Sequence, residues 1–252
     1  MKILTIFGTR PEAIKMCPVI KELNRRKEIK CTVCLTGQHK EMLEQVMSLF
    51  EIQAEYNLQI MKKNQTLSMI NSDILNGLDS IFEKEQPDLV LVHGDTSISF
   101  AAALAAFYHH IPVGHVEAGL RTYNMQSPYP EEFNRQAVDL ITDMYFAPTE
   151  LSKKQLLDEG KDTDKIFVTG NTVIDALQTT VSEDYQSDIL DWCKGSRMIL
   201  LTAHRRENIG VPMEHIFEAV KRIVCMHKDI KVIYPIHKNP KVREIAKRYF
   251  DD

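Results

Sequence analysis

The stretch that decides the fold reads DLVLVHGDTSISFAAALAAFYHHIPVGHVE, residues 88–117. Two short and almost continuously apolar runs, 88–93 and 112–117, flank a helical segment at 97–109. Strands that are apolar on both faces, with a helix between them, are typical of a parallel sheet covered by helices on both sides. The stretch therefore predicts a strand–helix–strand unit of an α/β protein.

The same alternation extends in both directions along the chain. Further strand-like runs are KILTIF (2–7), CTVCLT (31–36), MYFAP (144–148) and KIFVTG (165–170). Helices are predicted over 11–26, 41–50, 66–85 and from Glu131 onward. After Gly170 the chain becomes polar, and a second set begins with strand runs at 197–204 and 231–237 and helices at 213–227 and 240–249. We expect a domain junction around 170–195.

Composition excludes several function classes. The 252 residues are 44% hydrophobic and 26% charged, as in folded globular proteins, and 31 Lys and Arg against 35 Asp and Glu give a net charge of −4. This balance lacks the basic footprint that nucleic acid requires. Because no apolar run approaches the length of a membrane span, we expect a cytoplasmic protein. Cys31 and Cys34 form a C-x-x-C pattern, but residues three apart on a strand point to opposite faces, which argues against a redox or metal pair.

The first predicted strand leads into a possible anion site. In FGTRPEAIK (7–15), Thr9 and Glu12 have capping-box spacing and Pro11 suits the first helical turn. A helix N-terminus there would attract a phosphate, and Arg10 and Lys15 could add charge-assisted hydrogen bonds. The alternative is an ordinary capped helix with two solvated cations. The dinucleotide pattern G-x-G-x-x-G is absent from this turn, so neither NAD nor another cofactor is expected.

Carboxylates follow the next strands along the sheet edge. Asp95 comes after the run 88–93, Glu117 ends the run 112–117, and Glu131 begins a predicted helix. If they face one pocket, crowding would raise the pKa of at least one of them and provide an acid and a base in one site. Individually they would be a turn residue, an ion-pair partner and a helix-start charge.

Histidines give a second interpretation of the same edge. His93, Asp95, His115 and Glu117 recur at spacing two, which permits a metal cluster, but no H-E-x-x-H pattern supports one, and we expect hydrogen-bonded core histidines and no metal. Farther along, His204 ends the strand run 197–204 and Arg205 follows it. They could meet a diphosphate or move a proton, or form a surface turn.

Taken in order, long motifs resemble one enzyme family, the non-hydrolysing UDP-N-acetylglucosamine 2-epimerases. They are FGTRPEAIKM, TGQHKEML, VLVHGDT, IPVGHVEAGLRT, YPEEFNR, TGNTVIDAL, TAHRREN and YPIHKNP. The resemblance implies the GT-B arrangement, with an N-terminal Rossmann-like domain (1–170), a linker (171–195) and a partial second Rossmann-like domain (196–252). It also implies a homodimer that converts UDP-GlcNAc reversibly to UDP-ManNAc, by elimination and re-addition of UDP, for bacterial surface polysaccharide precursors.

The resemblance also implies residue roles. Arg10 and Lys15 match nucleotide contacts, and the positions assigned to catalysis or substrate contact are Asp95, Glu117, Glu131 and His204. Some family members bind a second UDP-GlcNAc as an activator, and the matching positions are Gln38, His39, Gln65, Arg205 and His237. Two neighbours, Glu41 and Asn64, differ from the glutamine and arginine of the regulated members.

One departure concerns length. The family's second domain continues beyond the equivalent of Asp252 with a DSGG-x-x-E segment that holds uridine and phosphate, so we expect a shortened second domain, weak nucleotide binding and little or no turnover from this polypeptide alone. Two alternatives remain open at this point: a non-catalytic UDP-sugar-binding or regulatory module, and a metal-dependent hydrolase.

Overall fold

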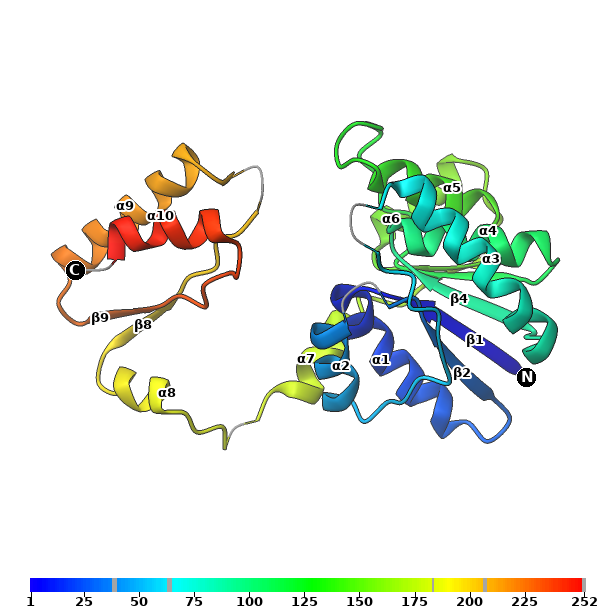
Figure 1. Ribbon diagram of the computed structural model, residues 1–252, viewed down its shortest axis with the longest axis horizontal. Coiled ribbons are helices and arrows are strands. Elements are labelled where there is room, and N and C mark those ends of the chain that lie inside the picture. The colour runs from blue at the N-terminus through cyan, green and yellow to red at the C-terminus, as the bar shows by residue number, and fades with distance from the viewer. Residues whose placement is uncertain (38–39, 63–64, 183, 206–207, 251–252) are drawn as a thin grey trace. The chain divides into compact units, whose positions relative to one another are not determined.

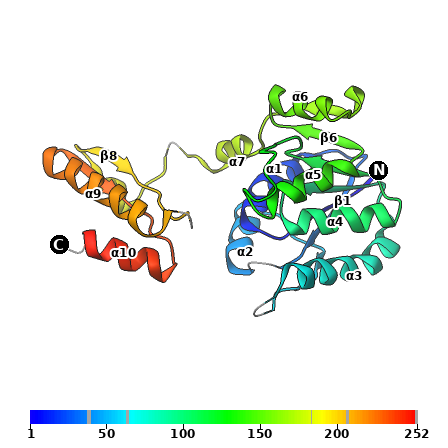
Figure 2. The same ribbon diagram turned by 90° about the horizontal axis from the view of Figure 1, so that it is seen from above.

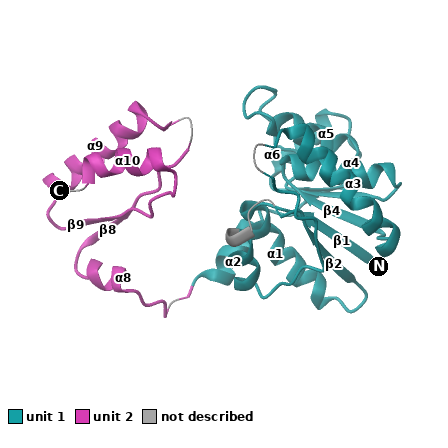
Figure 3. Ribbon diagram, viewed as in Figure 1, with its two compact units in different colours: residues 1–181 teal, residues 182–252 magenta. Residues whose placement is uncertain are grey.

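The computed structural model describes residues 1–37, 40–62, 65–182, 184–205 and 208–250. They form two compact units, Met1–Val181 and Ser182–Asp252 (Figure 3). The boundary lies inside the polar segment 171–195, which contains two helices that sequence reasoning did not predict. The first of them, α7 (Val173–Thr180), belongs to the first unit, and α8 (Asp188–Cys193) belongs to the second.

The first unit is built on a seven-stranded, fully parallel sheet in the order β3-β2-β1-β4-β5-β6-β7 (Figure 1). The strands are β1 (Lys2–Phe7), β2 (Lys30–Leu35), β3 (Tyr56–Asn57), β4 (Leu89–His93), β5 (Val113–Val116), β6 (Met144–Ala147) and β7 (Ile166–Val168). The connecting helices are α1 (Arg10–Arg25), α2 (Lys40–Leu49), α3 (Leu67–Glu85), α4 (Ser97–Tyr108), α5 (Glu131–Leu140) and α6 (Glu150–Asp158). The predicted α/β fold with a parallel sheet is confirmed, and the two-residue β3 was not foreseen.

Alternate side chains of each central strand enter different cores, which explains why the strands are apolar throughout. Val90 and Val92 of β4 pack with α3 and α4, whereas Leu89 and Leu91 pack in the core that α1 and α2 cover. Helices α3 and α4 lie side by side along the first of these faces (Figure 2). Cys34 and Cys31 divide in the same way between the two cores, as their spacing predicted.

The second unit contains a parallel pair of strands, β8 (Arg197–Leu200) and β9 (Ile230–Ile233), and the helices α9 (Val211–Met226) and α10 (Pro240–Phe250). Its small core centres on the fully buried Phe217. Several apolar side chains of this unit are exposed, among them Leu200 at 62% and Trp192 at 54%. Within the described ranges of the chain, none of the helices is both long and apolar enough to cross a membrane.

The strand order indicates where a sheet of this kind binds a ligand. The direction of winding reverses between β1 and β4, and in open α/β sheets ligands bind outside the carboxyl ends of the strands at such a reversal. The chain leaves β1 at Gly8, where an added Cβ would lie 1.8 Å from Thr36 Oγ1, so only glycine fits. Arg10 follows β1 and Asp95 follows β4, at this edge of the sheet.

Candidate active site

The turn after β1 forms the capping box that the sequence predicted. The Thr9 side chain accepts a hydrogen bond from Glu12 N, and Glu12 Oε2 accepts one from Thr9 N at 2.7 Å. Helix α1 therefore begins at the exposed Arg10, with its N-terminus at the edge of the sheet where β1 ends. Such a helix end favours a negatively charged ligand.

Glu12 does more than cap the helix. Its carboxylate is 1% exposed and also accepts hydrogen bonds from Gly8 N at 3.1 Å, Thr96 Oγ1 at 2.7 Å and Ser99 Oγ at 3.1 Å. Thr96 is the N-cap residue of α4 and directly follows Asp95. One buried carboxylate thus fastens the turn that carries Arg10 to the turn that carries Asp95.

Glu117 lies one residue beyond β5 and is held by groups from three other segments. Its Oε2 atom is 2.5 Å from Lys15 Nζ, 3.4 Å from His93 Nε2 and 3.1 Å from Asn171 Nδ2. The side chain is 14% exposed, and the backbone has a φ of 67°, which a residue with a side chain rarely adopts. Lys15 is therefore not a solvated cation, because it pairs with a carboxylate at the strand edge.

Glu117 is not a carboxylate whose pKa is raised by crowding. Burial alone would raise its pKa, but hydrogen bonds and charge from His93 and Lys15 outweigh burial and lower the pKa from 4.5 to about 2. The neighbours of Glu117 are cationic or polar groups instead of other acids. Glu117 is consequently ionised at neutral pH.

This pKa shift predicts a pH-dependent contribution to stability. Because the folded-state pKa lies below the unfolded one, the stabilisation is present above about pH 4.5 and is lost as the pH falls toward 2. The difference in unfolding free energy between the wild type and Glu117→Gln should therefore shrink through this window, by roughly 3 kcal/mol at most. Urea denaturation at a series of pH values measures it. A difference that stays constant across the window contradicts the prediction.

Asp95 and helix α5 are joined by two contacts. The Asp95 carboxylate pairs with the Arg135 guanidinium, and the backbone carbonyl of Asp95 accepts a hydrogen bond from Asn134 Nδ2 at 2.9 Å. Asp95 remains 31% exposed, whereas Arg135 is 11% exposed. Because His93 and Val116 are paired residues of β4 and β5, Asp95 and Glu117 follow neighbouring strand ends.

Glu131 is the first residue of α5, one helical turn before Arg135. Its Oε2 atom is buried and has no hydrogen-bond partner among the residues that the structure describes. The adjacent Glu132 has a different function. Its buried carboxylate accepts hydrogen bonds from Thr122 N at 3.0 Å and Tyr123 N at 2.9 Å, and these bonds hold the loop after β5. Glu131 is thus the acid of this pair whose oxygen is available for a ligand.

The histidine–carboxylate cluster that spacing two permits does not form. His115 is fully buried, as expected of a core histidine, and its ring nitrogens contact Asp139 Oδ1 at 2.6 Å and Gly94 O at 2.7 Å. His93 contacts Glu117, and Asp95 contacts Arg135. Over the described parts of the chain, no group of three or more His, Cys, Asp or Glu residues is arranged to hold a metal ion.

The remaining predicted site residues lie elsewhere. His204 belongs to the second unit, where its ring stacks on that of His237 with centroids 5.4 Å apart, and Arg205 follows it in the chain. His237 Nδ1 accepts a hydrogen bond from Asn239 N at 3.1 Å. In the first unit, Gln65 donates to Ile60 O at 2.6 Å. Gln38 and His39 lie outside the described residues.

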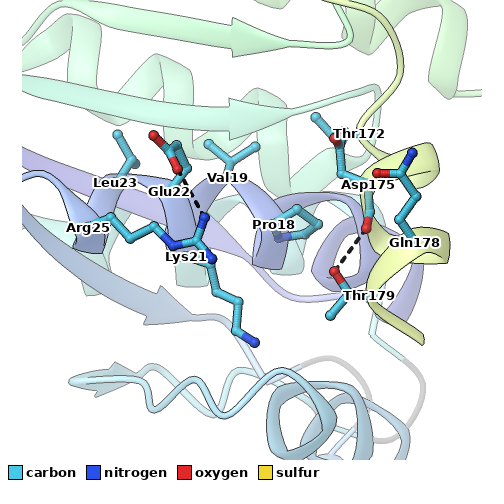
Figure 4. A pocket seen from close by; sticks show the side chains of 10 residues that line it. All are labelled: Pro18, Val19, Lys21, Glu22, Leu23, Arg25, Thr172, Asp175, Gln178 and Thr179. Carbon is cyan, nitrogen blue, oxygen red and sulfur yellow. Dashed lines mark hydrogen bonds and ion pairs between the residues drawn. The ribbon is translucent and has the colours of Figure 1, made fainter. Parts of the chain in front are cut away.

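A groove of about 530 Å³ lies between α1 and α7, away from the predicted site residues (Figure 4). Its lining includes charged side chains such as Lys21 and Asp175, and Glu22 pairs with Arg25 beside it. None of the residues predicted to bind or react with a substrate lines this groove. Its chemistry therefore does not suggest an active site.

Sequence reasoning missed three residues of the site. They are Glu12, Arg135 and Asp139, and each joins segments that are distant along the chain. Glu12 connects two turns, Arg135 pairs with Asp95, and Asp139 pairs with His115. The motif YPEEFNR contains Arg135, and its position one turn after Glu131 is the signal that could have identified it.

Comparison with known proteins assigns the family. The family model described as UDP-N-acetylglucosamine 2-epimerase matches residues 21–252. The UDP-N-acetylglucosamine 2-epimerase of Bacillus subtilis is 55% identical over 252 residues, which are 100% of this chain and 66% of that protein. A crystal structure from Listeria monocytogenes superposes with a TM-score of 0.95 at 52% identity, covering 100% of this chain and 66% of that one.

A further structure, UDP-GlcNAc 2-epimerase from Neisseria meningitidis bound to UDP-GlcNAc, gives a TM-score of 0.90 at 48% identity and covers 100% of this chain and 70% of that one. The chain spans about two thirds of the length of the B. subtilis relative. The sequence match and the strand-edge geometry agree with the resemblance of the motifs. The chain belongs to the UDP-N-acetylglucosamine 2-epimerase family.

Proposed function

We propose that the chain converts UDP-GlcNAc reversibly to UDP-ManNAc by eliminating and re-adding UDP. The observation that carries the proposal is Glu117, which is ionised and paired with Lys15 at the sheet edge where α1 begins. Family membership supports the reaction class, and the N. meningitidis relative is described as bound to UDP-GlcNAc.

The substrate dictates the order of bond changes. The C2 hydrogen of the sugar is not next to a carbonyl group, so a carboxylate cannot remove it directly. When the C1–O bond breaks, its electron pair leaves with UDP, and the positive character at C1 acidifies the C2 hydrogen. A carboxylate then takes this proton and C1 and C2 become joined by a double bond, giving 2-acetamidoglucal. Proton delivery to the opposite face of C2 and return of UDP to C1 complete the inversion.

The residues of the first unit suit these steps. Arg10, Lys15 and the N-terminus of α1 would stabilise the charge that develops on the departing diphosphate. Inversion needs proton transfer on both faces of C2, and we propose that Asp95, Glu117 and Glu131 divide these transfers. His204 of the second unit would contact the diphosphate.

A non-catalytic UDP-sugar-binding module is the second candidate. The observation that favours it is the small second unit, whose sheet has two strands and whose apolar Leu200 and Trp192 are exposed. For the same reason we expect the 252-residue polypeptide to bind nucleotide weakly and to turn over slowly.

Hydrogen exchange in deuterated water separates the two candidates. The protein, at a concentration equal to that of UDP-GlcNAc, is incubated for a long period, and the nucleotide sugars are analysed by proton NMR and mass spectrometry. Epimerisation predicts UDP-ManNAc and deuterium at C2 of both sugars, also when the reaction starts from UDP-ManNAc. Binding of UDP-GlcNAc without deuterium at C2 supports the module and contradicts the proposal. Irreversible, chelator-sensitive release of UDP would indicate a metal-dependent hydrolase instead.

The remaining proposals concern assembly and context. We propose a cytoplasmic homodimer that supplies precursors of surface polysaccharides, and a second UDP-GlcNAc site as the resemblance of the motifs implies. Analytical ultracentrifugation tests the dimer. Dependence of the deuteration rate on UDP-GlcNAc concentration above saturation of the first site tests the second site.

A further inference from the structure

His115 occupies the middle of β5 and both of its ring nitrogens face acceptors. Nε2 lies 2.7 Å from Gly94 O, and because a carbonyl oxygen can only accept, Nε2 carries a hydrogen. Nδ1 lies 2.6 Å from Asp139 Oδ1. The two contacts together use both edges of the ring, which is 0% exposed.

Asp139 is an ionised acceptor in this pair. Burial would raise its pKa, but the charges and hydrogen bonds of His115 and Arg121 lower it below its usual range. Its Oδ2 atom accepts a hydrogen bond from Gly119 N at 3.2 Å and pairs with Arg121 Nη2 at 2.7 Å. The His115 ring therefore contacts an oxygen atom at each of its two nitrogens. Arg121 in turn pairs with Glu159 at 2.7 Å.

The pair connects the two turns that carry the proposed catalytic acids. His115 contacts the carbonyl oxygen of Gly94, the residue directly before Asp95. The N–H of Gly94 donates to Val116 O at 2.9 Å, and Val116 directly precedes Glu117. Asp139 accepts a hydrogen bond from the N–H of Gly119, which lies two residues after Glu117. Gly94 and Gly119 have φ values of 67° and 81°, and an added Cβ at Gly119 would lie 2.4 Å from Ser152 O. Both turns need glycine at these positions, and at Gly119 the close Ser152 carbonyl excludes a side chain as well.

We infer that the His115–Asp139 pair is a positioning device, which fixes the spacing of Asp95 and Glu117 by holding Gly94 O and Gly119 N. The inference rests on the proposed function. Neither side chain reaches a substrate, because Asp139 is 1% exposed and His115 is fully buried. Groups that orient reacting or ligating side chains from behind change activity by about 10–100-fold when they are replaced.

Two substitutions at His115 separate its two contacts. The amide nitrogen of asparagine corresponds in position to Nδ1, so His115→Asn keeps the hydrogen bond to Asp139 and loses the one to Gly94 O. The longer glutamine places its amide nitrogen near the position of Nε2, so His115→Gln keeps the hydrogen bond to Gly94 O. His110→Asn, at an exposed position of the same unit, is the matched control.

The expected result is a rate effect without a binding effect. His115→Asn should lower the rate of C2 deuteration by about 10–100-fold while the Kd of UDP stays unchanged, and His115→Gln should recover part of the rate. His110→Asn should match the wild type. An unchanged rate in His115→Asn, or equal losses of rate and of UDP affinity, would overturn the inference.

A spectroscopic measurement on the wild type does not depend on turnover or on the folding of a variant. In ¹H–¹⁵N spectra of ¹⁵N-histidine-labelled protein, the Nε2–H of His115, which contacts Gly94 O, should give a signal that is protected from exchange with water. Rapid exchange of this hydrogen overturns the inference while leaving the proposed function intact. If the wild type does not deuterate C2, the proposed function fails. The His115 ring signal of the wild type, and the change of the Asp95 amide shift between the wild type and His115→Asn, then decide whether the pair holds the turn.

Discussion

Replacing Glu117 by glutamine is expected to reduce the rate of C2 deuteration by roughly 10²–10⁴-fold, the usual contribution of a positioned acid or base. A carboxamide keeps the shape of the side chain and can still contact Lys15, but it cannot accept the C2 proton. The wild-type carboxylate is ionised at neutral pH and can accept it. The rate is measured by proton NMR in deuterated water, with the Kd of UDP measured in parallel by calorimetry.

Glu22→Gln is the matched control for this substitution. Glu22 is also a carboxylate whose pKa is lowered by a basic partner, Arg26, but it is exposed near the end of α1 that lies away from the sheet edge. It should leave the rate unchanged. A Glu117→Gln protein that deuterates C2 at the wild-type rate would remove Glu117 from the proposed proton transfers.

Replacing Glu12 by glutamine should lower the unfolding free energy of the first unit by about 2–4 kcal/mol. The carboxylate accepts hydrogen bonds from two backbone N–H groups and two hydroxyl groups, all at or near the starts of α1 and α4. A carboxamide has one oxygen, so either the two N–H groups or the hydrogens of the two hydroxyl groups lose their acceptor. A buried donor left without an acceptor destabilises the fold.

The two units can be followed separately in this experiment. The single tryptophan, Trp192, lies in α8 of the second unit, so its fluorescence reports that unit, whereas far-ultraviolet circular dichroism is dominated by the larger first unit. Urea denaturation of Glu12→Gln should shift the dichroism transition. Glu150→Gln, at the exposed first position of α6, should change stability by less than about 0.5 kcal/mol. Equal stability of Glu12→Gln and the wild type would show that Glu12 does not fasten the two turns.

Sequence alone predicted the framework of the first unit because its signals are local. The runs 88–93 and 112–117 are buried on both faces, and the structure places them side by side as parallel strands. The capping box of Thr9 and Glu12 is equally local and formed as predicted. The strand β3 escaped prediction because two residues are too few to show any periodicity.

The electrostatics of the site could not be predicted in the same way. Glu117 was expected either to crowd with other carboxylates or to be an ion-pair partner, and the structure shows the ion pair, with Lys15 from 102 residues away in the chain. The second role of Glu12 was hidden because the capping box already explained the residue. Such partners are set by how helices pack on the sheet, which residue spacing along the chain does not encode.

Positional isotope exchange shows whether the C1–O bond of the substrate breaks and reforms. UDP-GlcNAc is prepared with ¹⁸O in the oxygen that joins C1 to the β-phosphorus, and ³¹P NMR follows the label. Elimination releases UDP, whose terminal phosphate oxygens become equivalent, so the account predicts ¹⁸O in non-bridging positions of recovered UDP-GlcNAc. Deuterium entering C2 while all ¹⁸O stays in the bridge would contradict it.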